Sequence, residues 1–330
     1  MPSTFKTNPE NLRDLLVKCH QGKTQLPDFQ RSWVWDIDRI ISLLASISKG
    51  FPVGALMALE AGGQVAFHPR PIEGSPDSNK DLEPRELILD GQQRMTSLYQ
   101  ATLRGQVIET KTTRGKKLKR WFYFDMEKAL DSSVSREESI IAVREDRTLR
   151  SQFDQIVELD LSSPEQEYQN LHYPISKVFE DMDWYMGFRD YWKGREGEEE
   201  SIRIFKQFRN DVLKNFTEFD VPVITLDKET TKEAVCIVFE KVNTGAKPLD
   251  AFELITAIYA ADGHRLRKDW YGEDGEEGIY GHLKVICKPG GAKHGILAGV
   301  EPTDFLHVIS LFHTRELRQQ AEADGKVGKD

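Results

Sequence analysis

The segment from Leu87 to Leu98, which reads LILDGQQRMTSL, constrains the fold of this chain more than any other segment. Its first three residues form a short apolar run that is typical of a buried strand. Gly91 permits the tight backbone turn that lets a strand lead directly into a helix. From Gln92 to Leu103 the apolar side chains recur at helical spacing, and Gly105 supplies a stop. The sequence therefore predicts a strand, a glycine turn and a helix in immediate succession.

The polar residues at this junction have the chemistry of a phosphate site. A helix N-terminus presents free N–H groups and a partial positive charge, which suit an anion. Gly91 lets a ligand approach the backbone closely, and Arg94 can hold a phosphate through two N–H groups. Asp90 can hold a catalytic or metal-bound water, while Gln92 and Gln93 offer amides that orient polar groups. We expect a nucleotide phosphate to bind here.

A purely structural interpretation of the same residues stays open. Asp-Gly is common before a helix, so Asp90 could simply cap it, with Arg94 paired to a surface carboxylate. The residue types at this junction do not decide between the two interpretations.

The segment Phe29-Gln30-Arg31 is a second candidate. Trp33 and Trp35 can anchor the loop while Gln30 and Arg31 point into a cleft. The alternative is that the aromatic side chains are ordinary core and that Arg31 is a solvated charge.

Two further segments carry chemistry of interest. Asn243-Thr244-Gly245 joins two predicted helices, and either a ligand contact or a structural turn explains it. A basic run lies at the tip of a predicted hairpin and is either a DNA-backbone contact or a solvated surface. The residues that we assign to DNA contact in this run are Lys116, Lys117, Lys119 and Arg120.

Length and composition limit the class of protein. At 330 residues, two sub-domains are expected, and we place them at residues 1–165, which read as α+β, and 166–330, which read as mostly helical. Apolar residues make up 39% and charged residues 30%, as in a soluble globular protein, and we expect it in the cytoplasm with no membrane partner. The net charge of −9 means that any contact with DNA must be local.

Familiar catalytic and metal motifs are absent. The sequence has no GxxxxGK[ST] loop, no GxGxxG after a strand, no HExxH and no GxSxG. The three cysteines are far apart, and the eight histidines show no metal-ligand spacing. An NTPase with this sequence would therefore not be a P-loop enzyme.

Periodicity and turn residues predict the remaining elements. We expect a helix over residues 8–21 with Asn8 as its cap, strands over 53–59 and 64–68, and a mobile loop over 69–84. A hairpin over 106–125 follows, then a helix that opens at Pro174 and another over 200–215. The last elements are a strand over 221–226 and helices over 231–242, 250–261 and 303–321.

Three of these segments, in this order, resemble the N-terminal domain of GmrSD-type modification-dependent restriction proteins, a family related to the ParB and sulfiredoxin fold. They are LPDFQRSWVWD at 26–36, LILDGQQRMTSLYQ at 87–100 and FEKVNTGAKPLDAFEL at 239–254. The resemblance covers about residues 8–261 and implies an α+β, ParB/sulfiredoxin-like mixed sheet followed by a mostly helical region.

The resemblance also implies a nucleotide site with assigned roles. The catalytic residues would be Asp90, Gln93 and Arg94, and Asp90 would hold a metal ion. The nucleotide-binding residues would be Gln30, Arg31, Gly91, Gln92, Arg94, Thr96 and Asn243. The cofactors implied are a nucleoside triphosphate and a divalent cation, Mg²⁺.

Proteins of this kind defend bacteria against phage by hydrolysing a nucleoside triphosphate and restricting modified DNA. The resemblance implies a sensor or regulatory domain whose partners are modified phage DNA, a nuclease domain or subunit, and further copies of itself. The HNH-type constellation of such a nuclease is absent before Asp330, so we expect the chain to continue in a longer protein. Two alternatives stay open: a non-catalytic ParB-like nucleotide switch that binds DNA, and a metal-dependent nuclease that uses Asp90.

Overall fold

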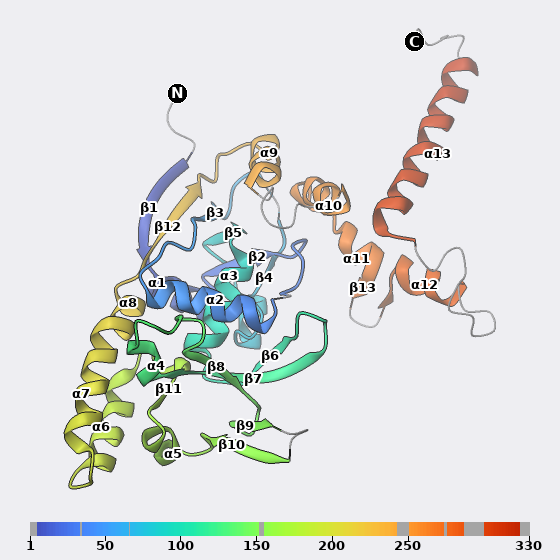
Figure 1. Ribbon diagram of the computed structural model, residues 1–330. Helices are drawn as coiled ribbons and strands as arrows, with labels where there is room; N and C mark the ends of the chain where they lie inside the picture. Colours follow the sequence, from blue (N-terminus) through green and yellow to red (C-terminus); the bar gives the residue numbers. More distant parts are fainter. Residues whose placement is uncertain are drawn as a thin grey trace. The chain divides into compact units, whose positions relative to one another are not determined.

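The computed structural model describes residues 5–33, 35–65, 67–151, 155–242, 251–273, 276–286 and 300–323 (Figure 1). The chain forms two compact units. Unit 1 comprises Met1–Pro27, Arg31–Ala61 and Pro69–Lys228, and unit 2 comprises Asp28–Gln30, Gly62–His68 and Glu229–Asp330. The division that the sequence predicts at residue 165 falls within unit 1. The helices between residues 165 and 228 belong to unit 1 and pack on its core, and the helices after residue 228 belong to unit 2.

A six-stranded mixed sheet forms the centre of unit 1. Its strands are, in spatial order, β1 (Phe5–Asn11), β12 (Asp220–Leu226), β3 (Leu56–Glu60), β5 (Glu86–Asp90), β2 (Thr24–Pro27) and β4 (Pro69–Arg70). The pairs β12–β3 and β2–β5 are parallel, and the other pairs are antiparallel. The predicted α+β class with a mixed sheet is confirmed.

Three helices of this unit contain a sequence motif or lie next to one in the chain. They are α1 (Leu12–His20), α2 (Ile37–Ser48) and α3 (Gln92–Leu98), and α3 continues as a π-helical turn over Tyr99–Leu103. Asn11 caps α1 by accepting a hydrogen bond from the Arg13 N–H at 3.0 Å. Asp36 caps α2 in the same way by accepting a hydrogen bond from the Arg39 N–H at 3.0 Å.

The predicted start of the first helix is wrong. Residues 5–11 form β1, in which Asn8 lies opposite Val223 of β12, so Asn8 is no helix cap. A partner strand more than two hundred positions away satisfies this backbone. The local cap-and-proline pattern therefore loses to tertiary pairing.

A second, four-stranded sheet contains the basic hairpin. Its strands are β6 (Ile108–Lys111), β7 (Lys117–Asp125), β8 (Ile140–Val143) and β11 (His172–Pro174). The antiparallel pairing of β6 with β7 confirms the hairpin predicted over 106–125. A separate hairpin joins β9 (Thr148–Ser151) to β10 (Ile156–Asp160).

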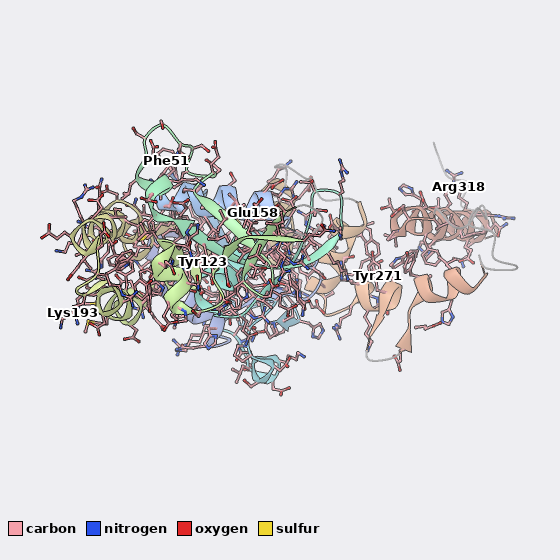
Figure 2. All side chains as sticks on the ribbon, turned by 60° about the horizontal axis from the view of Figure 1, so that its bottom comes forward. Phe51, Tyr123, Glu158, Lys193, Tyr271 and Arg318 are labelled. Atoms are coloured by element: carbon pink, nitrogen blue, oxygen red, sulfur yellow. The ribbon has the colours of Figure 1, made fainter. Side chains whose placement is uncertain are left out.

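The remaining helices of unit 1 enclose an aromatic core. They are α4 (Met126–Leu130), α5 (Pro164–Gln169), α6 (Asp181–Trp192), α7 (Glu198–Phe208) and α8 (Lys214–Thr217), with a π-helical turn over Arg209–Leu213 between the last two. Pro174 pairs with Tyr123 of β7 and ends β11, and only a 3₁₀ turn over Ile175–Lys177 follows it. The aromatic-rich helix predicted to open at Pro174 begins at Asp181 instead. Tyr123, which Figure 2 labels, is only 1% exposed in the interior of this unit.

Two predictions for residues 64–84 are also corrected. Among the described residues of 64–68 there is no strand, and β4 begins only at Pro69. The stretch 69–84, predicted as a mobile loop, contains β4 and a 3₁₀ turn over Asp77–Asp81. Ile72 and Asn79 in this stretch are buried, so it is part of the packed structure.

Unit 2 is mostly helical. Its helices are α9 (Lys232–Val242), α10 (Ala251–Ala261), α11 (Leu266–Tyr271), α12 (Ile279–Ile286) and α13 (Pro302–Ala323), with short strands β13 (Gly272–Glu273) and β14 (Glu276–Glu277). Phe29 packs edge-on against Phe67 and Phe239, and Asp28 forms an ion pair with Arg265 at 2.7 Å. No helix that the structure describes has both the length and the apolar character needed to cross a bilayer.

Candidate functional site

The predicted junction between strand and helix is present. Strand β5 ends at Asp90, Gly91 has a φ of 91°, and α3 begins at Gln92. A Cβ atom on Gly91 would overlap Cδ2 of Leu56, which is buried in the neighbouring strand β3. Both the backbone conformation and the packing therefore require glycine here. The N-cap position is Gly91 itself, and no side chain caps α3, so Asp90 does not have the capping role of the structural interpretation.

Arg94 is held by three acceptors of unit 1. Its Nη1 donates to the Val53 carbonyl at 2.6 Å, and its Nη2 donates to the Ala55 carbonyl at 2.9 Å and to Oδ2 of Asp90 at 3.1 Å. A Cβ on Gly54 would lie 2.6 Å from Nη1, so the loop needs glycine to reach this close. In this structure Arg94 fixes the Asp90 carboxylate against the loop before β3.

Two of the predicted segments come together next to this pair. The Gln92 side-chain amide donates to the carbonyl of Arg31, and the Gln93 amide donates to the carbonyl of Ser32 at 3.3 Å. Arg70 donates to the same Arg31 carbonyl at 3.2 Å. The two glutamines therefore hold the backbone of the loop that carries Arg31.

Trp33 is anchored at both its backbone and its ring. Its backbone N–H donates to Oε1 of Glu73 at 2.9 Å, and its indole Nε1–H donates to Oγ of Ser97 at 2.9 Å. Ser97 in turn donates to the carbonyl of Gln93 at 2.7 Å, and Arg70 forms an ion pair with Glu73 at 3.0 Å. The loop and the helix are thus joined through side chains as well as backbone.

Sequence reasoning missed Arg70, Glu73 and Ser97. The first two lie in the stretch that we predicted to be a mobile loop. Their spacing of three residues in an otherwise proline-rich stretch is the only local signal of an ion pair. That signal does not show that the pair supports a distant loop.

Several buried polar atoms of the Arg31 loop, of α3 and of the stretch that contains Glu73 have no hydrogen-bond partner among the described residues. Within the described part of the chain, Nη1 of Arg31, Oγ1 of Thr96 and Oε2 of Glu73 are buried without a partner. Leaving a buried charged N–H unpaired costs free energy, because water no longer solvates it. A phosphate oxygen would supply the acceptor that Arg31 lacks, so the residues present fit a phosphate group.

Two further residues, Gln30 and Asn243, are predicted to contact the nucleotide. Gln30 belongs to unit 2, where it is 7% exposed. Asn243 lies outside the described residues. Their assignment to the nucleotide site stays a prediction.

The metal assignment rests on Asp90 alone. Among the described residues, no three His, Cys, Asp or Glu side chains form a group that could hold a metal ion. Mg²⁺ is commonly held by one or two carboxylates together with the phosphates of a nucleotide. The assignment of a metal ion to Asp90 stays a prediction.

The basic residues lie on the β6–β7 hairpin as predicted. Lys116 is exposed at its turn, and Lys119 forms an ion pair with Glu145 at 3.0 Å. The hydrogen bond from Lys119 to that carboxylate raises the pKa of the Lys119 ammonium. Lys117, Lys119 and Arg120 line a groove together with Trp33 and Trp35.

The fold and this cluster define an α+β protein whose polar site forms where a strand turns through glycine into a helix and meets a tryptophan-bearing loop. Residues 12–260 match the family described as the GmrSD restriction endonuclease, N-terminal domain, and the chain belongs to this family. The family membership predicted from the three motifs is confirmed.

A curated relative extends the comparison. An uncharacterized protein of Methanocaldococcus jannaschii is 25% identical over 268 residues, which cover 79% of this chain and 43% of that protein. The chain thus spans less than half of the length of this relative.

Proposed function

We propose that this protein binds and hydrolyses a nucleoside triphosphate and acts as the sensor or regulatory domain of a modification-dependent restriction system against phage. The observation that carries the proposal is the buried Nη1 of Arg31, which has no acceptor and lies on the loop held by Gln92 and Gln93. A bound phosphate would pair this charge. Membership of a restriction endonuclease family supports the biological setting.

The contacts assign separate roles to the two arginines. Arg31 would hold a phosphate, whereas Arg94 would position Asp90 through their ion pair at 3.1 Å. Asp90 would orient water or a metal ion, and Gln93 would orient the attacking water once it leaves the Ser32 carbonyl. A bound Mg²⁺ would neutralise charge on the phosphates during transfer.

The larger assembly is part of the same proposal. Modified phage DNA would be the effector, and a nuclease domain or subunit would carry out the cleavage. The greater length of the curated relative is consistent with further domains in such proteins.

The test measures binding of four nucleoside triphosphates and release of phosphate, with and without modified phage DNA. We expect Arg31→Ala to weaken binding at least tenfold, with Arg31→Lys intermediate because a single ammonium cannot replace the planar guanidinium. The matched control is Arg203→Ala, which removes an arginine that is 65% exposed. Wild-type protein that binds no nucleoside triphosphate would overturn the proposal, and cleavage of plasmid DNA by the chain alone would favour the nuclease alternative.

A ParB-like nucleotide switch without turnover is the second candidate. It is favoured by the engagement of Gln93 and Arg94 with backbone carbonyls, since donors already in use are not poised for catalysis. Tight nucleotide binding with no phosphate release under any DNA condition would support the switch.

A further inference from the structure

Unit 1 contains a groove that the nucleotide proposal does not use. It has a volume of about 790 Å³ and lies between the loop of Trp33 and Trp35, the β6–β7 hairpin and residues 144–145. This volume is in the range of pockets that hold small ligands or a segment of a polymer.

The groove carries an excess of positive charge. Its basic side chains are Lys111, Lys117, Lys119, Arg120 and Arg144. Its carboxylates are Glu109 and Glu145, and Glu145 is already paired with Lys119. This local charge contrasts with the net charge of −9 for the whole chain. Positive charge concentrated in one hollow of an acidic protein indicates an anionic ligand.

Two tryptophans add flat apolar surfaces to the same groove, and hydrogen bonds hold the ring of Trp33 and the backbone of Trp35. The Trp33 indole is tied to Ser97 of α3 by the 2.9 Å hydrogen bond. The Trp35 carbonyl accepts a hydrogen bond from Oγ1 of Thr110 on β6 at 2.9 Å, and the adjacent Asp36 forms a β-bridge with Lys111. The Trp33 ring, which is already held, can therefore stack on a base with little loss of side-chain entropy, and the Trp35 ring projects from a backbone that is held.

We propose that the groove binds a single strand of DNA, with bases stacked on Trp33 and Trp35 and phosphates on the lysines and arginines of the hairpin. Aromatic side chains beside a basic track are the general means of binding single strands, because every unpaired base has a face that can stack. A mononucleotide would need only one or two of the five cations. The exposed Lys116 at the hairpin turn extends the basic track beyond the groove.

Trp33 links this groove to the helix of the proposed nucleotide site. The chain of contacts runs from the Trp33 indole to Ser97, and from the Ser97 hydroxyl to the Gln93 carbonyl. A base stacked on Trp33 would therefore contact a ring that is hydrogen-bonded to α3. This link, unlike DNA binding itself, rests on the proposed nucleotide function.

The experiment measures fluorescence anisotropy of a labelled single-stranded oligonucleotide of about twelve nucleotides, a length within the range that such grooves cover. We expect Trp35→Ala to weaken binding about five- to one-hundredfold and Trp35→Phe to retain most of it. The double variant Lys117→Glu/Lys119→Glu should also weaken binding and lower the slope of log Kd against log salt by about 1 or more. This surface variant keeps the inference testable if Trp35→Ala fails to fold.

The control variant Lys193→Glu/Lys206→Glu reverses the charge of two exposed lysines outside the groove. Lys193, which Figure 2 labels, follows α6, and Lys206 lies on α7. The same net charge change should leave oligonucleotide affinity near that of wild type. Equal losses in the two double variants would mean that only overall charge matters, and would overturn the inference.

Further measurements distinguish single-stranded DNA from mononucleotides and duplex DNA, and distinguish failure of the groove proposal from failure of the nucleotide proposal. Deoxynucleoside monophosphates that compete as well as the oligonucleotide, or a blunt duplex that binds equally well and independently of Trp35, would overturn the single-strand assignment. Nucleoside triphosphate binding without DNA should be unchanged in Lys117→Glu/Lys119→Glu. If wild-type protein binds no triphosphate but shows Trp35-dependent binding of DNA, the groove stands and the proposed nucleotide function fails.

Discussion

The Asp90 carboxylate accepts a hydrogen bond at 3.1 Å from Nη2 of Arg94, one helical turn further along the chain. The same guanidinium donates to the carbonyls of Val53 and Ala55 before β3. The orientation of the carboxylate at the end of β5 thus depends on a loop some forty positions earlier. Arg94 is therefore a positioning residue for Asp90.

Replacing Arg94 with alanine should lower both stability and activity. The substitution removes three hydrogen bonds made by a charged group that is 20% exposed, so the free energy of unfolding should fall by about 2 kcal/mol or more. Urea unfolding measures this loss. The control Arg203→Ala, whose side chain is 65% exposed, should cost less than about 1 kcal/mol.

The kinetic consequence of the same change distinguishes positioning from phosphate binding. With Asp90 no longer oriented, kcat for phosphate release should fall more than KM rises. A rise in KM at constant kcat would instead show that Arg94 holds the substrate directly.

Replacing Gly91 with alanine should destabilise unit 1 more than the same change at Gly115. Both glycines have positive φ, 91° and 84°, so each alanine costs about 1–2 kcal/mol in backbone strain. At Gly91 the new methyl group also overlaps Leu56, which adds about 1–3 kcal/mol, whereas nothing lies within 4 Å at Gly115. Chemical denaturation of the two variants measures the difference, and equal losses would contradict the close packing of β3 on the turn.

Removing the Glu167 carboxylate should strongly destabilise the aromatic core. Glu167 is 4% exposed and accepts hydrogen bonds from the Tyr123 hydroxyl at 3.0 Å and the Trp184 indole at 2.8 Å. Glu167→Ala leaves two buried donors unpaired, at a cost of about 3 kcal/mol in unfolding free energy. The matched control on the same helix is the exposed Glu165, whose replacement by alanine should cost less than about 1 kcal/mol. Similar thermal midpoints for the two variants would argue against the buried network.

The folded protein should become less stable as the pH falls, because His172 is buried. This side chain is 8% exposed, and burial lowers its pKa below the usual 6.5. The unfolded chain then binds the proton more readily, so the stability contributed by the neutral ring is complete above pH 6.5 and is lost as the pH falls through the lowered pKa.

The measurement compares urea midpoints between about pH 7.5 and pH 5.5, the range in which an ordinary histidine titrates. His172→Gln should show a smaller decline than wild type, because glutamine keeps a donor for the Asn170 carbonyl but cannot take up the proton. His313→Gln, on the exposed surface of α13, should follow the wild-type curve.

The sequence by itself determined the elements whose signals are local. The run from Leu87 through Gly91 into a helix, the hairpin around Gly115 and the strand over 221–226 all appear in the structure. Apolar periodicity and the conformational freedom of glycine act within a few residues, so a short window contains the information. The order of three motifs also determined the family, which the match over 12–260 confirms.

Tertiary structure decided the contacts that make the site. Residues 8–11 became a strand because β12 pairs with them, and Arg70 and Glu73 became supports for Trp33 although their sequence reads as loop. The acceptors of Arg94 and the groove beside Trp35 likewise combine residues far apart in the chain. Backbone pairing and buried hydrogen bonds choose partners by position in space, and a sequence window contains only neighbours along the chain.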